Sequence, residues 1–369
     1  MTDPLALGEK LLALLDESAR TTTYKSALLM ALIDRAQEYA GRESIPVRTL
    51  AERVVELYWP QTLVYPTTGH VLKQSQTSTG RAAIVHAILS FRDEYAAASR
   101  ALPPAIRHEP GWAELLARVE ETLAEWPIPR LQRPYEPFVY SFDWGSAEAG
   151  GWSVRAYRTT GRAIRLYPGV GDALTVLGPL LRPFITRWWT DKAAQLNPEV
   201  EAARSVLEFE DFLFGRDRVA LERIAEGLLD LQHGACLYCH TTIGRSREID
   251  HFIPWTYSGD DGIDNLVAAC RRCNNSKRAN LAGPDYVAQI IGRNHTWDRD
   301  LAALSVERRW PRDPDRTRRI TRAAYLRSPG ERPLWIRAGT GIIFDTLEQH
   351  RQELAALLTD ASAGTQGRR

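Results

Sequence analysis

The chain has 369 residues, enough for two or three compact domains, and its hydrophobic fraction of 44% and charged fraction of 25% are those of an ordinary globular protein. The formal net charge of +1 excludes a strongly basic protein, so any cationic surface must come from local clusters of Lys and Arg. No secretory signal pattern and no apolar run of the ~18 residues that a membrane helix needs is visible. We therefore expect a cytoplasmic protein without a membrane partner, whose thiols stay reduced.

The first part of the chain is predicted to be mainly helical. A leucine stripe from Leu5 to Leu15 indicates one helix, and threonines at 21–23 precede an apolar run that indicates a second. Further helices are predicted over Val47 to Tyr58, which stops before Pro60, over Arg81 to Ala98, and near Trp112 to Trp126.

The middle and the end of the chain mix short strands with helices. The strand-like runs Phe138–Trp144 and Trp152–Arg158 are separated by glycines and predict a hairpin. A long helix is predicted from about Val170 to Leu196, two more lead to Gly234, and another lies near Tyr286. The last predicted element is an amphipathic helix over 344–358, followed by a tail at 361–369 that is expected to be disordered.

The four cysteines of the chain form two matched pairs, Cys236-x-x-Cys239 and Cys270-x-x-Cys273. Two residues between cysteines let both thiolates reach one ion from a tight turn, and four thiolates complete a closed structural zinc site. Four unrelated buried thiols are the alternative, but they would have to form two such pairs by accident. His233 and His240 flank the first pair and are interpreted as bystanders, because four cysteines already satisfy the metal.

The residues around and between the two pairs point to further chemistry. A short strand-like run ends in Glu248-Ile-Asp-His251, a turn-rich loop leads to Asp264-Asn-Leu266, and Asn274-Asn-Ser-Lys277 follows the last cysteine. In this order and spacing the region 229–282 resembles the HNH endonucleases, whose nuclease module has a ββα-metal fold that a four-cysteine zinc site often stabilises. The resemblance implies a fold that is mainly α with a small ββα-metal, zinc-stapled HNH module in a multi-domain chain.

The resemblance also implies a role for each matching residue. His251 would be the general base and Asn265 would orient it, while Asp250 and Asn274 would hold the catalytic divalent ion, as in the H-N-N variant of the signature. An imidazole suits proton transfer near neutral pH, and carboxylate and amide oxygens suit Mg²⁺ or Mn²⁺. The cations Arg271, Arg272, Lys277 and Arg278 are predicted to contact DNA phosphates.

Each of these roles has an alternative. His251 could be a structural histidine bound to a backbone carbonyl, and Asn265 could simply stabilise a turn. Glu248 is interpreted as an exposed strand residue or an outer contact of the metal site. Asn275 is the neighbour that could be confused with Asn274, and the position directly after the cysteine favours Asn274.

We therefore predict four regions: an N-terminal helical domain at 1–135, an α+β connector at 136–228, the HNH nuclease module at 229–283 and a C-terminal helical, Arg-rich segment at 284–369. The predicted activity is metal-dependent hydrolysis of DNA phosphodiester bonds, with structural Zn²⁺ and catalytic Mg²⁺ or Mn²⁺, in restriction or anti-phage defence. DNA is the expected partner, with a homodimer or a defence-system protein as further candidates. The N-terminal helices and the Arg-rich segment are expected to hold or choose the substrate. The alternative function is a zinc-stabilised DNA- or protein-binding module with a vestigial nuclease site.

Overall fold

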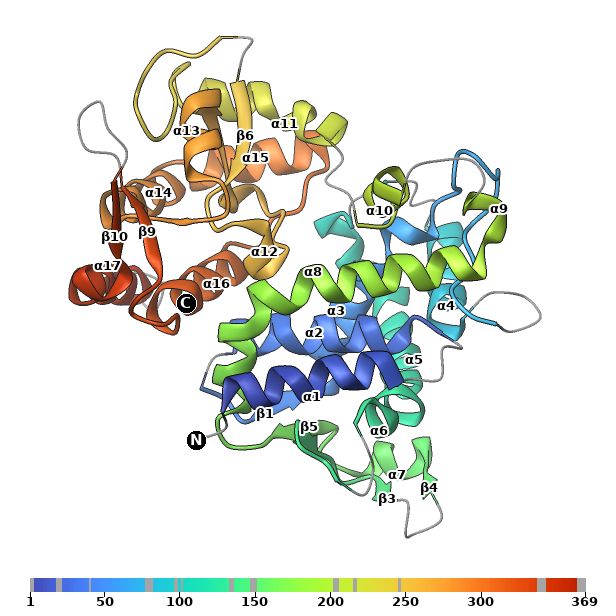
Figure 1. Cartoon of the computed structure of the whole chain (residues 1–369). Helices are drawn as coiled ribbons and strands as arrows, with labels where there is room; N and C mark the ends of the chain where they lie inside the picture. Colours follow the sequence, from blue (N-terminus) through green and yellow to red (C-terminus); the bar gives the residue numbers. More distant parts are fainter. Residues whose placement is uncertain are drawn as a thin grey trace. The chain divides into compact units, whose positions relative to one another are not determined.

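The computed structural model describes residues 3–17, 22–39, 41–76, 82–95, 99–100, 102–132, 136–146, 151–201, 206–214, 218–244, 247–336 and 343–363. The chain divides into two compact units, Met1–Asp217 and Arg218–Arg369, and each is described by itself (Figure 1). The predicted fold class, mainly helical with a small zinc-site module in a multi-domain chain, is confirmed. The finer division into four regions stays a prediction.

Helices make up most of the first unit. They are α1 (Pro4–Glu17), α2 (Tyr24–Glu38), α3 (Val47–Tyr58), α4 (Ala83–Glu94), α5 (Gly111–Glu125), α6 (Pro127–Leu131), α7 (Val154–Thr159), α8 (Val170–Leu196), α9 (Pro198–Glu201) and α10 (Val206–Phe214), with the 3-10 helices η1 (Pro60–Thr62) and η2 (Pro104–His108). Helices α3 and α8 have the predicted bounds, while α4 is shorter than the predicted 81–98 helix.

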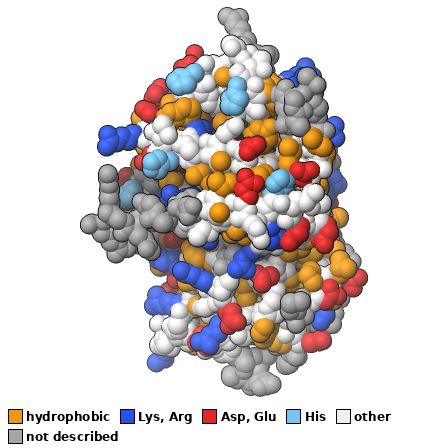
Figure 2. All heavy atoms as spheres, turned by 90° about the vertical axis from the view of Figure 1, so that its left-hand side faces the viewer, with side chains coloured by type: hydrophobic (Ala, Val, Ile, Leu, Met, Phe, Trp, Pro, Cys, Tyr) orange, Lys and Arg blue, Asp and Glu red, His pale blue; other side chains and the backbone are white. Residues whose placement is uncertain are grey.

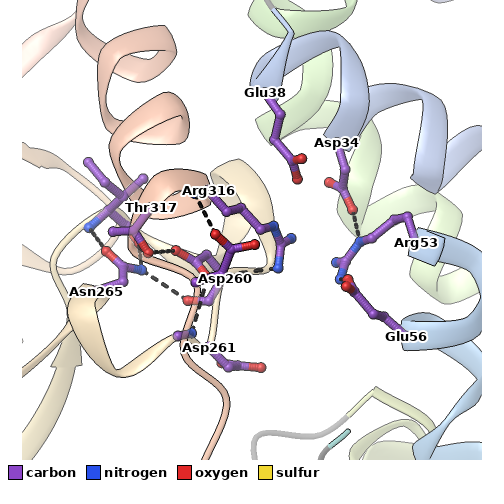
Figure 3. A network of polar contacts seen from close by, with 12 residues as sticks. Asp34, Glu38, Arg53, Glu56, Asp260, Asp261, Asn265, Arg316 and Thr317 are labelled. Atoms are coloured by element: carbon purple, nitrogen blue, oxygen red, sulfur yellow. Dashed lines mark hydrogen bonds and ion pairs between the residues drawn. The ribbon is translucent and has the colours of Figure 1, made fainter. Parts of the chain in front are cut away.

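Helix α2 forms the centre of this unit and packs against α3, α6 and α8. Its apolar run from Ala27 to Ile33 is buried all round, as expected for a helix without a polar face. The polar end of α2 is buried as well. There the Asp34 carboxylate forms an ion pair with Arg53 of α3, at 2.5 Å (Figure 3). It forms a second ion pair with Arg182 of α8. Pairing compensates for the loss of hydration of these charges.

Short strands complete the first unit. Strands β1 (Ser44–Pro46), β5 (Ala163–Leu166) and β2 (Tyr140–Ser141) form an antiparallel sheet in that order, and β3 (Gly145–Ser146) pairs with β4 (Gly151–Trp152). The predicted hairpin between the runs 138–144 and 152–158 is therefore wrong, because the strand in the first run, β2, pairs with β5 and the short hairpin is formed by β3 and β4. The second run is extended only as far as Trp152. Ser153 ends it, because its hydroxyl accepts a hydrogen bond from the Ala156 backbone N–H at 3.1 Å and caps helix α7.

The second unit alternates strands and helices. Its elements are α11 (Arg218–Leu231), β6 (Arg247–His251), α12 (Trp255–Ser258), η3 (Ile263–Asn265), β7 (Leu266–Cys270), α13 (Arg271–Lys277), β8 (Leu281–Ala282), α14 (Pro284–Thr296), α15 (Asp298–Arg308), α16 (Pro314–Leu326), β9 (Pro333–Ile336), β10 (Ile343–Thr346), η4 (Leu347–His350) and α17 (Arg351–Ala363).

Asp250 and His251 lie on β6, Cys270 ends β7 and Asn274 lies on α13, while α12 and η3, which ends at Asn265, connect the two strands. Figure 1 shows β6 and α13 in this unit. The two strands are antiparallel, with a register that runs from Arg247 opposite Cys270 to His251 opposite Leu266. Helix α13 begins at the residue after β7 and packs against both strands. This is the predicted ββα module.

A second small sheet in this unit pairs β8 with β9 in parallel and β9 with β10 antiparallel. Strand β10 corrects the predicted final helix over 344–358, whose first residues are extended. Phe344 lies opposite Trp335 of β9, and Thr346 forms a capping box with Gln349 that starts the following 3-10 helix.

Candidate active site

The four cysteines meet in one cluster. Their Sγ atoms all lie within 4.8 Å of one another, and those of Cys239 and Cys270 are 3.7 Å apart. Tetrahedral zinc at the usual Zn–S distance of about 2.3 Å separates its sulfur ligands by about 3.8 Å, so the cluster fits this ion. Among the described residues no His, Asp or Glu joins the group, and His233 and His240 are not part of it.

Two different backbone structures bring the thiols together. Cys236 and Cys239 lie in a tight turn after α11, in which the His240 N–H donates to the Cys236 carbonyl at 2.9 Å. The N–H of Leu237 donates to the Ala268 carbonyl and so attaches this turn to β7. The second pair lies at the start of α13, where the Cys270 sulfur accepts a hydrogen bond from the Cys273 N–H at 3.4 Å.

Close packing of the thiols shifts the pKa values of Cys236, Cys270 and Cys273 in different directions. A hydrogen bond from Cys273 lowers the pKa of Cys236 to about 4, and the same bond raises the pKa of Cys273. Burial raises the pKa of Cys270. Because thiolates are the forms that bind metal, a divalent cation would relieve the repulsion that keeps the remaining thiols protonated.

Strand β6 and helix α13 face each other through four polar side chains. Glu248 and Asp250 are two residues apart in β6 and therefore lie on the same face of the strand. On α13, the Asn274 Nδ2 donates to Glu248 Oε2 at 2.6 Å, and the Lys277 Nζ lies 3.0 Å from Asp250 Oδ2. The predicted metal ligands Asp250 and Asn274 are thus on facing surfaces of the strand and the helix, and Glu248 contacts the second of them.

The Asp250 carboxylate is buried and held by two donors. The Tyr238 hydroxyl donates to its Oδ2 at 2.5 Å, and burial beside this carboxylate raises the pKa of Tyr238 well above its ordinary value. Lys277 is the second donor. Its ammonium also donates to the His251 carbonyl at 2.8 Å, so one cation fixes both residues of the Asp-His pair.

The predicted phosphate contacts separate into two groups. Arg271, Arg272 and Arg278 are exposed, as a phosphate contact requires. Lys277 has 0% of its surface exposed, so the prediction that it contacts a phosphate does not fit its position inside the module. On the molecular face drawn in Figure 2, acidic and basic side chains are interspersed, which agrees with the net charge of +1.

The His251 side chain lies at the end of β6, and only 6% of it is exposed. Its Nε2 atom is 2.7 Å from Oδ1 of Asp261, a residue in the loop that joins α12 to η3. Asp261 was not among the site residues predicted from the sequence. The signal was its place in the polar Ser258-Gly-Asp-Asp-Gly262 stretch between the Asp-His pair and Asn265.

Asn265 acts on the loop rather than on the imidazole. Its Nδ2 donates to the carbonyls of Ile253 and Asp260, both at 3.0 Å, and its Oδ1 accepts from the Ile253 N–H at 2.8 Å. The backbone carbonyl of Asn265 also accepts from the Phe252 N–H at 2.8 Å. These bonds hold together the two ends of the loop between β6 and β7, which carries Asp261 (Figure 3).

Helix α16 contacts the same loop at the buried side chain of Asp260. The Thr317 hydroxyl donates to Asp260 Oδ2 at 2.8 Å, and Arg316 Nη1 lies 3.8 Å from Oδ1 (Figure 3). Burial raises the pKa of Asp260, an effect that Arg316 and Thr317 oppose. The carbonyl of Asp261 accepts from the Trp310 indole N–H at 2.8 Å.

Two further arginines hold the end of the loop. Arg312 Nη2 lies 3.2 Å from Oδ1 of Asp264, and the buried Arg293 donates to the carbonyls of Leu266 and Asp264. Burial lowers the pKa of Arg293 to about 10. The guanidinium groups of Arg312 and Arg316, both in the Arg-rich segment, thus contact carboxylates of this loop. The expectation that this segment holds or chooses the substrate stays a prediction.

Comparison with known proteins identifies the class of this site. The family model described as HNH endonuclease matches residues 236–280, which include the four cysteines, the Asp250-His251 pair, Asn265 and Asn274. The chain therefore carries an HNH endonuclease domain. A second family model, described as a domain of unknown function (DUF8808), matches residues 5–209. This match spans more than half of the chain, which belongs to the DUF8808 family.

One curated relative and one solved structure carry the name Cas9. The chain is 39% identical over 90 residues to the CRISPR-associated endonuclease Cas9 of Actinomyces naeslundii, a match that spans 21% of this chain and 8% of that protein. A structural comparison pairs 83% of the chain with 46% of the crystal structure of the Type II-C Cas9 enzyme from Actinomyces naeslundii, at 15% identity and a TM-score of 0.19. A score this low carries no argument about the fold of the chain.

None of the helices in the described part of the chain is both long enough and apolar enough to span a lipid bilayer.

Proposed function

We propose that the chain is a metal-dependent DNA endonuclease of the HNH type, which hydrolyses phosphodiester bonds. The observation that carries this proposal is the pairing of β6 with α13. It sets the Asp250 carboxylate and the Asn274 amide on facing surfaces of the strand and the helix. The buried His251 directly follows Asp250 in the chain. Carboxylate and amide oxygens are hard ligands that suit Mg²⁺ or Mn²⁺, whereas the thiolates of the cysteine cluster are soft ligands that suit zinc.

In the proposed reaction His251 takes a proton from the attacking water, whose oxygen forms the new bond to phosphorus. The bond from phosphorus to the leaving sugar oxygen breaks, that oxygen takes a proton from solvent, and His251 later returns its own proton to solvent. A divalent cation held by Asp250 and Asn274 would stabilise the negative charge that develops on the phosphate. The exposed Arg271, Arg272 and Arg278 would bind neighbouring phosphates of the strand.

The structural zinc would hold the scaffold rather than take part in the reaction. The cysteine cluster joins the turn after α11 to the junction of β7 and α13, so it maintains the helix that carries Asn274. Restriction or anti-phage defence is the proposed setting. The partial similarity to a CRISPR-associated endonuclease supports it.

One observation favours the second candidate, a zinc-stabilised DNA- or protein-binding module with a vestigial nuclease site. The Asp250 carboxylate already has an ammonium group and a hydroxyl as partners, so a metal ion has to share this carboxylate with them or displace them. The two candidates differ in whether DNA is cut or only bound.

Incubation of the full chain with supercoiled plasmid, in Mg²⁺, Mn²⁺ or EDTA, tests the proposal. We expect nicked circles before linear DNA with either metal, no products in EDTA, and loss of cleavage in His251→Ala. The matched control is His295→Ala, which removes an exposed histidine of the same unit. Equal cleavage by His251→Ala would remove this residue from the mechanism. DNA binding without cleavage in any metal would favour the vestigial site.

A further inference from the structure

The first unit carries an exposed indole beside a stacked guanidinium. Trp126 directly follows helix α5, and 52% of its surface is exposed. The Arg130 guanidinium of α6 lies over its ring, 4.6 Å from the ring centroid, and 5.1 Å from the ring centroid of Trp152 on β4. One face of the Trp126 ring thus contacts a cation, and the large exposed fraction leaves ring surface open to another planar group.

The guanidinium is held in place without the use of all its donors. Its Nη1 donates to the carbonyls of Glu125 and Trp126, at 2.6 and 3.3 Å, at the C-terminal end of α5. An arginine has five N–H groups, and no hydrogen bond within the described part of the chain uses those of Nε and Nη2. The face of a guanidinium stacks on aromatic rings, while its edge donates to phosphate oxygens. The exposed Arg130 can therefore do both.

The cations at this surface have no carboxylate partners. Burial, and then repulsion by Arg130, lower the pKa of the half-buried Lys25 at the start of α2. Neither cation forms an ion pair with another described residue, whereas Arg118 on α5 and Arg158 on α7 are both paired with glutamates of α5. A bound anion would relieve the repulsion between Lys25 and Arg130.

A single nucleic-acid strand fits this surface better than a protein or a duplex. Among the described residues at 111–132 and 151–152, Trp126 is the only large hydrophobic side chain that is exposed, so the apolar area is too small for an amphipathic helix. The bases of a duplex are stacked on one another, whereas a single strand presents open base faces. Aromatic rings that stack on bases, next to cations that contact the backbone, bind single strands in many proteins.

We propose that Trp126, Arg130 and Lys25 form a binding surface for single-stranded DNA: a base stacks on the exposed Trp126 indole, and the phosphate beside it binds the remaining N–H groups of Arg130 and the Lys25 ammonium. This inference rests on the proposed function, because the HNH domain in the second unit is the reason to expect DNA. The surface gives the first unit a part in holding the substrate.

The first test measures binding without cleavage. Fluorescence anisotropy of a labelled single-stranded DNA oligonucleotide with the full chain, without added Mg²⁺ or Mn²⁺, gives the Kd. We expect Trp126→Ala to raise Kd by about 5- to 150-fold, the effect of losing one stacked base, and Trp126→Phe to retain most of the affinity because a phenyl ring still stacks. The control Phe184→Ala removes an exposed aromatic side chain of α8 and should change nothing. Equal affinity of folded Trp126→Ala and wild type would overturn the inference.

The second test separates charge from stacking. Arg130→Gln should lower the magnitude of the slope of log K against log salt concentration by about 0.7, the value for one phosphate of a single strand, while Trp126→Ala should leave the slope unchanged. Arg118→Gln changes an exposed, ion-paired arginine of α5 and is the control. Thermal unfolding checks that each variant is folded. An unchanged slope in Arg130→Gln would contradict phosphate binding by this residue.

Other nucleic acids test the choice of partner. Trp126→Ala should bind a duplex as the wild type does, and equal weakening for duplex and single strand would contradict base stacking. Tighter binding of RNA than of DNA of the same sequence by the wild type would overturn the choice of DNA.

Plasmid nicking separates this inference from the proposed function. If the wild type cuts nothing while Trp126→Ala loses affinity for single-stranded DNA, the proposed function fails and the surface stands. If the wild type nicks plasmid and Trp126→Ala binds single-stranded DNA normally, the surface alone is wrong.

Discussion

The Lys277 ammonium lies 3.0 Å from the Asp250 carboxylate inside the module, and its own side chain has no exposed surface. The same ammonium donates to the carbonyl of His251. A buried cation is stable only when it is paired, and here the pair joins helix α13 to the strand that ends in the Asp-His dipeptide. The position of the proposed catalytic pair therefore depends on a residue that the sequence analysis assigned to the substrate surface.

Lys277→Met should destabilise the second unit because it leaves the Asp250 carboxylate buried without its cation. We expect the free energy of unfolding to fall by about 3–5 kcal/mol. A urea titration of the full chain, with zinc release as the probe of this unit, measures the change. Arg278→Met, at an exposed neighbouring position, should change little, and adding Asp250→Asn to Lys277→Met should recover part of the loss. An equal loss in the single and double variants would show that the pair does not matter.

Asn265→Ala should abolish cleavage although this amide makes no described hydrogen bond to the imidazole. The variant loses three hydrogen bonds that hold the loop, and each buried group left unpaired costs about 1–3 kcal/mol. Hydrogen exchange of the Ile253 amide, which is bonded to Asn265 Oδ1, should become faster. The exposed Asn275→Ala is the matched control. Normal protection of Ile253 in Asn265→Ala would contradict the bracing role.

Removal of Arg312 should make stability more dependent on pH. Burial already raises the pKa of Asp264, and Arg312 opposes this rise, so Arg312→Met should raise that pKa further. The folded state of the variant then disfavours the ionised Asp264 carboxylate more than the folded wild type does. The loss of stability relative to wild type should be absent below the ordinary Asp pKa of about 4, grow as the pH rises through the raised value, and be constant above it.

Urea unfolding of wild type and Arg312→Met at several pH values measures this difference. Arg299→Met changes an exposed arginine of the neighbouring helix α15 and serves as the control. A stability difference that is the same at every pH would show that Arg312 acts through packing rather than through the charge of Asp264.

The cysteine cluster should bind one zinc ion per chain, and mild EDTA treatment should not remove it. Cys236→Ser and Cys273→Ser each replace a buried thiolate ligand, so we expect metal-free protein whose second unit is unfolded or insoluble. Elemental analysis of purified protein gives the stoichiometry. His240→Ala, next to the first pair but outside the cluster, should retain full zinc. Stoichiometric zinc in either serine variant contradicts four-thiolate binding.

DNA binding should weaken with salt, and Arg271→Ala should reduce that dependence. If Arg271 contacts one phosphate, the slope of log K against log salt concentration should fall in magnitude by about 0.9 on duplex DNA. Fluorescence anisotropy with labelled DNA at several salt concentrations measures the slope, with EDTA present to prevent cleavage. Arg299→Ala, on α15, is the control. An unchanged slope in Arg271→Ala would place its side chain away from the DNA.

The local parts of the site could be read from the sequence because they depend on residues close together in the chain. Two residues between cysteines suffice to predict a metal-binding turn, and the Asp-His pair at the end of a strand needs no distant partner to be noticed. Helices α3 and α8 were likewise predicted, since a helical apolar period and flanking prolines or glycines are local signals. The ββα order was expected only through the resemblance of these motifs to the HNH endonucleases.

Tertiary structure decided which charged residues belong to the site and which hold it together. Lys277 is buried because α13 packs on β6. Arg312 and Arg316 form ion pairs with carboxylates of the loop at 260–264, because α16 and the residues before it pack against that loop, which lies about 50 positions earlier in the chain. The partnership of Asp261 with His251 depends on the path of the same loop. Composition and spacing state which charges a chain has, but the pairing of each charge depends on which segments exclude water from it. That is a property of packing between distant segments.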